Sequence, residues 1–230
     1  MYDEHHHRNI SGGGARAAVF GISDGLVSNV SLILGMAGAH SSAASVRLAG
    51  VAGLIGGAFS MAAGEYVSMR AQSELMEREL EVERRAIQAD PEDERQELAA
   101  LYRSRGIEAA LADELSVKMM RNPDLALETH AREELGFTPG NTGKPLQAAM
   151  SSFVTFALGA LIPLLPWLFT SGNTALVWSI ALAAVASVAV GAALSAFTGR
   201  SWLWSALRQL LISGIAAAVT FGVGHLIGSG

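Results

Sequence analysis

Two carboxylates lie inside stretches of sequence that are otherwise apolar. Asp24 falls within FGISDGLVSNVSLILG, residues 20–35, and Glu65 falls within a second apolar stretch. A carboxylate buried in a membrane is unfavourable unless a partner or water offsets its charge. Between residues 17 and 69 the only basic residue is Arg47, which lies in the link between the two stretches. A bound cation is therefore the predicted partner of these carboxylates.

Helical spacing puts further polar groups beside the two carboxylates. Asp24, Ser28 and Ser31 follow i, i+4, i+7 spacing and share one helix face, and Met61 and Glu65 share a face of the second stretch. A thioether is a poor ligand for Mg²⁺ or Ca²⁺ but an acceptable one for a transition metal. These five residues therefore predict a path for Fe²⁺, Mn²⁺ or a similar ion. In the alternative interpretation Glu65 reaches the membrane interface and Met61 fills a core.

A second group of candidate ligands lies in a charged segment, residues 71–145. This segment holds 17 of the 21 acidic residues and 10 of the 16 basic ones. Its glutamates recur at helical spacing, in the sets Glu74, Glu77 and Glu81, then Glu94 and Glu97, with Glu79 and Glu83 close by. The adjacent Glu133 and Glu134 lie near the end of the last predicted helix of the segment. Such stripes either bind metal or form solvated helix faces with arginine partners, and periodicity alone favours the solvated face.

Five apolar stretches are long enough to position these groups as membrane-spanning helices, which need about 20 residues each. They cover residues 17–39, 48–70, 147–170, 174–197 and 203–227. Half of the residues are hydrophobic and only 16% are charged, as is typical of a membrane protein. The predicted fold is an all-α membrane protein with a tail at 1–16, transmembrane helices at 17–70, a cytoplasmic helical metal-binding insert at 71–145, and three transmembrane helices at 146–230.

Arginine placement predicts the orientation in the membrane. If the insert is cytoplasmic, Arg8, Arg16, Arg200 and Arg208 are cytoplasmic too, and only Arg47 lies outside. The N-terminus is then inside and the C-terminus outside. The preference for Arg over Lys and the short tail favour a bacterial plasma membrane. The three histidines at residues 5–7 of the tail are a metal ligand, a tag remnant or a solvated segment.

Local signals predict the helices of the insert and the shape of the spans. No Gly or Pro occurs from Glu65 to Asp90, so the second span is predicted to continue as one helix into the insert. Asp90 and Asn122, each followed by proline, are predicted helix starts. Pro163 and Pro166 are predicted to bend or break the third span. Glycines at GxxxG spacing allow close helix contact and are compatible with a dimer, at Gly21/Gly25, Gly53/Gly57 and Gly224/Gly228.

The segments SDGLVSNVSLILG and SMAAGEYVSMRAQSE resemble the vacuolar iron transporter family, and the likeness extends over residues 15–228. The resemblance implies a dimeric, proton-coupled exporter of Fe²⁺, and often Mn²⁺, from the cytosol. It also implies that Asp24 and Met61 line an ion path between two subunits, with Glu65 beside them as in bacterial-type members.

The resemblance also implies a set of ligands in the insert, namely Glu83, Glu94, Glu97 and Glu134. Two positions depart from the family pattern. Ala86 stands where a further ligand glutamate is expected, and His130-Ala131 stands where a methionine pair is expected. These changes leave fewer oxygen ligands and no sulfur, although His130 or Glu81 can substitute.

The leading hypothesis is therefore a secondary transporter that exchanges Fe²⁺ or Mn²⁺ for protons, since a carboxylate in a low-dielectric site can exchange a proton for metal. Zn²⁺ and Co²⁺ are also compatible. No organic cofactor is expected, and no nucleic-acid partner, because no basic stripe exists. One alternative is a membrane-anchored metal-binding or storage protein. Another is a di-iron oxidase, but such bundles use Glu-x-x-His pairs, and residues 17–228 contain none.

Overall fold

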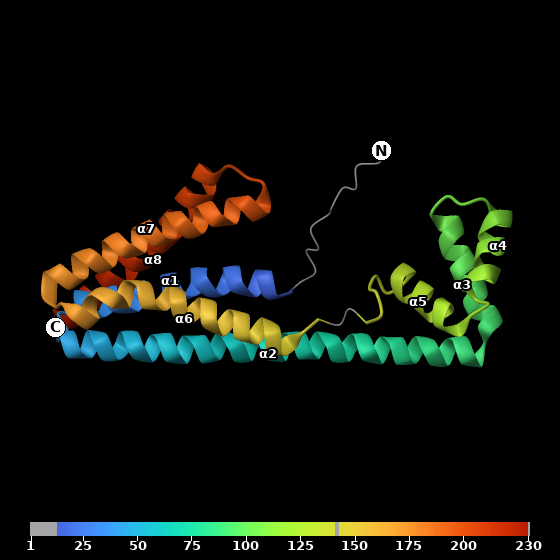
Figure 1. Cartoon of the computed structure of the whole chain (residues 1–230), viewed down its shortest axis with the longest axis horizontal. Coiled ribbons are helices and arrows are strands. Elements are labelled where there is room, and N and C mark those ends of the chain that lie inside the picture. The colour runs from blue at the N-terminus through green and yellow to red at the C-terminus, as the bar shows by residue number, and fades with distance from the viewer. Residues whose placement is uncertain (1–12, 141–142, 230) are drawn as a thin grey trace. The chain divides into compact units, whose positions relative to one another are not determined.

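The computed structural model describes residues 13–140 and 143–229, and within these ranges the only regular elements are helices (Figure 1). Five of them are long and apolar enough to cross a membrane, which confirms the predicted all-α membrane fold. The tail histidines at residues 5–7 lie outside the described ranges. The helices are α1 (Gly13–Gly38), α2 (Ala43–Ala89), α3 (Pro91–Ser104), α4 (Ala109–Met119), α5 (Pro123–Glu133), α6 (Pro145–Phe169), α7 (Gly172–Thr198) and α8 (Trp202–Gly228).

The chain forms two compact units. The membrane unit combines Met1–Val67 with Lys144–Gly230, and the insert unit is Ser68–Gly143. Helix α2 has 47 residues without a break and contributes to both units (Figure 1). The predicted continuity of this helix is confirmed, and it follows from the absence of Gly and Pro after Gly64. The side of the membrane on which the insert unit lies stays a prediction.

Helix α1 is the centre of the membrane unit and packs mainly against α6 and α8. Glycines make these contacts close. A Cβ on Gly25 would lie 2.1 Å from the carbonyl oxygen of Phe156 in α6, and one on Gly224 in α8 would lie 1.9 Å from that of Gly35. All three GxxxG pairs face neighbours within this chain. The spacings therefore serve intrachain packing and give no support to a dimer.

Helix α6 runs without a break through Pro163 and Pro166, so of the predicted bend or break the break does not occur, and the bend stays a prediction. Neighbouring groups satisfy backbone carbonyls beside the prolines. The hydroxyl of Ser179 in α7 donates to the carbonyl of Pro163, and both the backbone N–H and the hydroxyl of Thr170 donate to that of Pro166. These bonds go to the prolines' own carbonyls. The carbonyls that lose a helical donor lie four residues earlier, at Gly159 and Ile162, and membrane helices tolerate proline where the surroundings offset that loss.

The helices of the insert unit begin at the predicted caps. The Asp90 carboxylate accepts from the backbone N–H of Asp93 at the start of α3, and the Asn122 side chain accepts from that of Asp124 at the start of α5. Each cap satisfies a backbone donor that the helix leaves unpaired. Two small apolar clusters hold the helices together, one around Leu98, Tyr102 and Ala112, the other around Ile87, Ala126 and Leu127.

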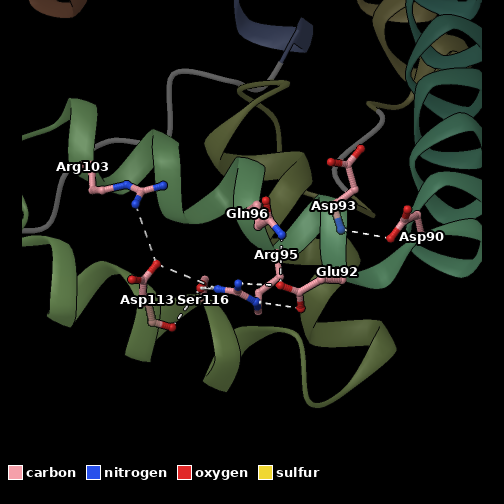
Figure 2. A network of polar contacts seen from close by, with 8 residues as sticks. All are labelled: Asp90, Glu92, Asp93, Arg95, Gln96, Arg103, Asp113 and Ser116. Atoms are coloured by element: carbon pink, nitrogen blue, oxygen red, sulfur yellow. Dashed lines mark hydrogen bonds and ion pairs between the residues drawn. The ribbon is translucent and has the colours of Figure 1, made fainter.

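A polar network ties α3 to α4 (Figure 2). The Arg95 guanidinium donates to the Glu92 carboxylate at 2.6 Å and to the Ser116 hydroxyl at 3.3 Å, and it lies 3.9 Å from Asp113. Arg103 also lies 3.9 Å from Asp113. Arg95 therefore pairs with Glu92, Ser116 and Asp113. Glu94, the preceding residue, instead lies near His130.

Candidate metal path and metal centre

Asp24 lies on α1 at the wall of a cavity in the membrane unit. Its Oδ1 accepts a hydrogen bond of 2.9 Å from the Ser28 hydroxyl, one helical turn away. Asp24, Ser28 and Met61 line this cavity, which has a volume of about 300 Å³. The lining of the cavity therefore brings together a carboxylate and a hydroxyl of α1, which helical spacing puts on one face, and a thioether of α2.

Met61 links Asp24 to Glu65. It lines the Asp24 cavity, a second cavity of about 520 Å³ that also holds Asp24 and Arg208, and a third of about 290 Å³ that holds Glu65 and Arg16. Asp24 and Glu65 share none of these three cavities. The geometry thus gives a stepwise series from Glu65 through Met61 to Asp24.

Glu65 has a basic neighbour that the sequence did not indicate. Its side chain is only 17% exposed. Its Oε1 lies 3.9 Å from the guanidinium of Arg16, which is in the first turn of α1. The Arg16 side chain is 75% exposed, and Glu65 Oε1 accepts no hydrogen bond among the described residues, so Arg16 is a weak partner for this carboxylate. A bound cation at Glu65 stays a prediction, and such an ion would lie beside that guanidinium.

Ser31 stands apart from the other candidates. Its hydroxyl is buried and accepts or donates no hydrogen bond within the described part of the chain, and it lines none of the three cavities that hold Asp24, Met61 or Glu65. Ser28, by contrast, is exposed at the cavity mouth. Their roles in a metal path stay predictions.

The insert unit holds a cluster of carboxylates around His130. This imidazole on α5 is fully buried, and its Nδ1 lies 3.0 Å from Glu83 Oε1, 3.1 Å from Glu134 Oε1 and 3.7 Å from Glu94 Oε2. Potential ligand atoms of His130, Glu83 and Glu94 all lie within 4.8 Å of one another. The cluster joins α2, α3 and the end of α5 in one centre.

The electrostatics of this cluster favour a cation. Burial first, and then the charge of Glu83, raises the pKa of Glu94 to about 7. Burial also raises the pKa of Glu134, against the opposing effect of His130. Burial alone would lower the pKa of His130, but the surrounding carboxylates raise it overall. All three groups therefore hold protons more tightly than they would in water, and a metal ion can replace those protons.

The other predicted glutamates have different surroundings. Glu74 pairs with Arg70, and Glu81 pairs with both Arg84 and Arg85, so these two belong to a solvated helix face in this structure. Glu77 is exposed. Glu97 is exposed too, although its charge is close enough to raise the pKa of Glu94 and Glu134. Whether any of them binds metal stays a prediction.

The donor set of the cluster suits a divalent transition metal. Three carboxylates and one imidazole offer oxygen and nitrogen ligands without sulfur, a combination that Fe²⁺, Mn²⁺ and Zn²⁺ all accept. In the ion pairs found among the described residues, the insert's arginines contact other acids, so His130 is the basic partner of Glu83, Glu94 and Glu134. The cluster thus keeps an excess of negative charge.

Comparison with known proteins identifies the family of this chain. The family model described as "VIT family" matches residues 15–225. The chain belongs to the VIT family. A vacuolar iron transporter of Centaurea cyanus is 33% identical over 223 residues, covering 96% of this chain and 90% of that protein. One of Acanthamoeba castellanii is 34% identical over 227 residues, covering 97% and 83%, and vacuolar iron transporter 1 of Arabidopsis thaliana is 32% identical over 223 residues, covering 96% and 89%.

Sequence reasoning missed two features of this VIT-family membrane unit. One is the contact between Arg16 and Glu65. The other is Asn29, a buried amide that lines the Asp24 cavity. The position of Arg16 at the start of a span was a usable signal for the first, because antiparallel packing brings the start of α1 near the end of the second span. A polar residue in an apolar stretch was a usable signal for the second.

Proposed function

We propose that this protein exports divalent transition metal, Fe²⁺ and also Mn²⁺, from the cytoplasm in exchange for protons. The observation that carries the proposal is the intramembrane carboxylate of Asp24, which shares a cavity with the Met61 thioether in a chain whose relatives are named vacuolar iron transporters. A carboxylate at that depth can hold either a proton or a metal ion, and it is unfavourable when it holds neither of them.

The insert cluster supplies the first step of this mechanism. Glu83, Glu94, Glu134 and His130 would capture a cytoplasmic metal ion and release protons as they bind it. The ion would then pass Glu65, where it displaces Arg16, and reach Met61 and Asp24. Protonation of Asp24 from the opposite side of the membrane would release the ion there. The arginine distribution supports a cytoplasmic insert and N-terminus and an external C-terminus. The preference for Arg over Lys and the short tail support a bacterial plasma membrane.

A homodimer completes the path in this proposal. Ser28 and Ser60 are exposed in this chain, although both lie inside spans and line the Asp24 cavity. Polar groups facing lipid are unfavourable, so a second copy of the chain is the proposed cover. The chain has no native cysteine, which makes cross-linking direct. Ser28→Cys should trap dimers in bilayers, whereas Val219→Cys, exposed on α8, should not; equal yields would reject the arrangement.

Metal flux into sealed vesicles tests the transport itself. Purified protein is reconstituted with a lumen more acidic than the bath, and a panel of Fe²⁺, Mn²⁺, Zn²⁺ and Co²⁺ is offered outside. We expect Fe²⁺ and Mn²⁺ uptake that stops when a protonophore collapses the gradient. Uptake that ignores the gradient would contradict proton exchange.

A membrane-anchored metal-binding protein is the second candidate, and the His130 cluster is the observation that favours it. Such a protein would bind metal on the vesicle exterior without moving it inside. A chelator added outside separates the two outcomes, because it removes bound metal but leaves transported metal in the lumen.

A further inference from the structure

Asn29 is an amide side chain fixed in one orientation inside the membrane unit. It is 2% exposed, and its Nδ2 donates a hydrogen bond of 2.6 Å to the carbonyl of Ala160 in α6. A backbone carbonyl can only accept, so the NH₂ end must face Ala160 and the oxygen must face away from it. The orientation of the amide is therefore determined by its partner.

The oxygen end of this amide lies beside Gly53 of α2, at the cavity that Asp24 and Met61 line. Asn29 and Gly53 are both on the wall of that cavity, and a Cβ built on Gly53 would lie 2.9 Å from Asn29 Oδ1. Within the described residues, Oδ1 is buried and accepts no hydrogen bond. A desolvated acceptor without a donor is unfavourable, and a bound cation is one way to satisfy it.

We propose that Asn29 Oδ1 is a further ligand of the transported divalent cation, beyond Asp24 and Met61, and that Gly53 leaves the room beside this oxygen that a cation needs. The proposal rests on the proposed transport function. An amide oxygen is a neutral, hard ligand of the kind that binds cations in proteins. It replaces a water of hydration without adding charge, so it stabilises the ion in the path without holding it as strongly as a second carboxylate would.

Gly53 has a defined part in this arrangement. A Cβ built on Gly53 would lie 2.9 Å from the oxygen of Asn29 and 3.5 Å from the nearest atom of Leu32, so the missing side chain leaves room beside this oxygen on the α2 side. Gly53→Ala would place a methyl group against Oδ1 and leave the hydrogen bond to Ala160 on the opposite end of the amide. This substitution therefore separates a ligand role of Asn29 from a purely structural link between α1 and α6.

The test measures Mn²⁺ uptake by reconstituted vesicles over a range of Mn²⁺ concentrations. For Gly53→Ala we expect KM to rise about tenfold, the equivalent of losing one moderate ligand, with a maximal rate that changes less. Asn29→Leu, which keeps the size but removes the oxygen, should raise KM at least as much. Gly222→Ala on α8, where an added Cβ meets no atom within 4 Å, is the matched control and should behave as wild type.

The outcomes separate this inference from the transport proposal. If the wild-type protein moves no Mn²⁺, the transport proposal fails and takes the ligand role with it. If wild type transports but Gly53→Ala keeps the wild-type KM, only the role of Asn29 is overturned. A rise in KM that comes with a lower unfolding temperature of the metal-free Gly53→Ala protein also overturns it, because damaged packing then explains the change. Gly53→Ala keeps the question open to test even if Asn29→Leu does not fold.

Discussion

Asp24 combines two properties that are unfavourable together, a formal charge and a position inside an apolar helix. The Ser28 hydroxyl donates one hydrogen bond to it, and among the described residues no arginine or lysine forms an ion pair with it. One neutral hydrogen bond does not balance a charge in a membrane. A cation is therefore the partner that this carboxylate lacks.

Replacing Asp24 by Asn should abolish transport while the protein still folds. The amide is nearly isosteric and neutral, so insertion into the membrane should be as good or better. It cannot balance a divalent ion or exchange a proton, so proton-driven Mn²⁺ uptake should fall to the background of empty vesicles. Metal binding by the insert should persist, as measured by calorimetry on the full-length protein.

Two further variants calibrate that result. Asp24→Glu keeps the charge and shifts it by one methylene, so it should retain partial activity. Ser28→Ala removes one neutral hydrogen bond, typically worth about 1 kcal/mol, and should do much less harm. Normal transport by the Asn variant at matched protein levels would place the ion path elsewhere.

Residue type and helical spacing were sufficient to predict that Asp24 and Ser28 share a face of α1, which their hydrogen bond agrees with. They were not sufficient for Arg16 or Asn29, because the role of each depends on a partner from another helix. Glu65 needs the fold of α1 on α2 to meet Arg16, and Asn29 needs the backbone of α6. Periodicity also could not separate Glu83, which joins His130, from Glu81 two residues earlier, which pairs with arginines.

At the scale of the helices, glycine determines how closely α1 approaches its neighbours. Gly25 sits against the backbone of α6, and Gly35 sits against Gly224 of α8. The sequence predicted close helix contact from GxxxG spacing but could not identify the partner. GxxxG spacing indicates only that one face of a helix has small residues, which let another backbone approach closely. It does not specify which helix packs there.

Gly25→Ala should therefore destabilise the membrane unit. The added Cβ would lie 2.1 Å from a backbone oxygen, which cannot move aside as a side chain can. Overpacking of this kind typically costs about 1–3 kcal/mol. The measurement is thermal unfolding in detergent followed by tryptophan fluorescence, since all four tryptophans lie in the membrane unit. Gly222→Ala should unfold like wild type, and an equal loss in both variants would contradict the packing argument.

The helices of the insert make a second prediction. Glu94→Gln combined with Glu97→Gln keeps the shape and helix propensity of α3 but removes two charges near His130. Mn²⁺ binding to the full-length protein should weaken by about tenfold or more, because one close carboxylate and one supporting charge are lost. Transport should survive at high metal concentration, since Asp24 and Met61 are unchanged.

Glu114→Gln is the control for that experiment. Glu114 is an exposed residue of α4 paired with Lys118, away from the cluster ligands. If the double variant binds Mn²⁺ as tightly as this control, the glutamates of α3 are a solvated face and the metal ligands of the insert lie elsewhere.

At the scale of the whole molecule, pH should act in opposite directions on the metal-free and metal-bound protein. The pKa of Glu94 is raised from 4.5 to about 7, and those of Glu134 and His130 are raised too. Between pH 4.5 and about 7 the folded protein binds more protons at Glu94 than the unfolded chain does. The free energy of unfolding of the metal-free protein therefore falls as pH rises toward about 7. Metal binding displaces those protons, so stabilisation by metal grows over the same range.

Hydrogen exchange of the insert peptides measures this directly on the full-length protein. Without metal, protection of residues 68–140 should be greater at about pH 5.5 than at about pH 8, after correction for intrinsic exchange. With Mn²⁺ the order should reverse. Glu94→Gln should flatten the metal-free dependence, and a dependence of wild-type size in that variant would assign the effect to other groups.

The contacts of α1 also determine when the membrane unit can be completed during synthesis. This helix emerges first from the ribosome, yet its main neighbours are the third and fifth spans. The Asn29 amide has no acceptor until Ala160 is made, and Ser23 receives its hydrogen bond of 2.6 Å only when Gln209 in α8 arrives. The polar side chains of Asn29 and Ser23 in the first span therefore lack these partners while most of the chain is translated. Closure of the bundle is a late event, and a chain without the span formed by α8 lacks one of the two main neighbours of α1.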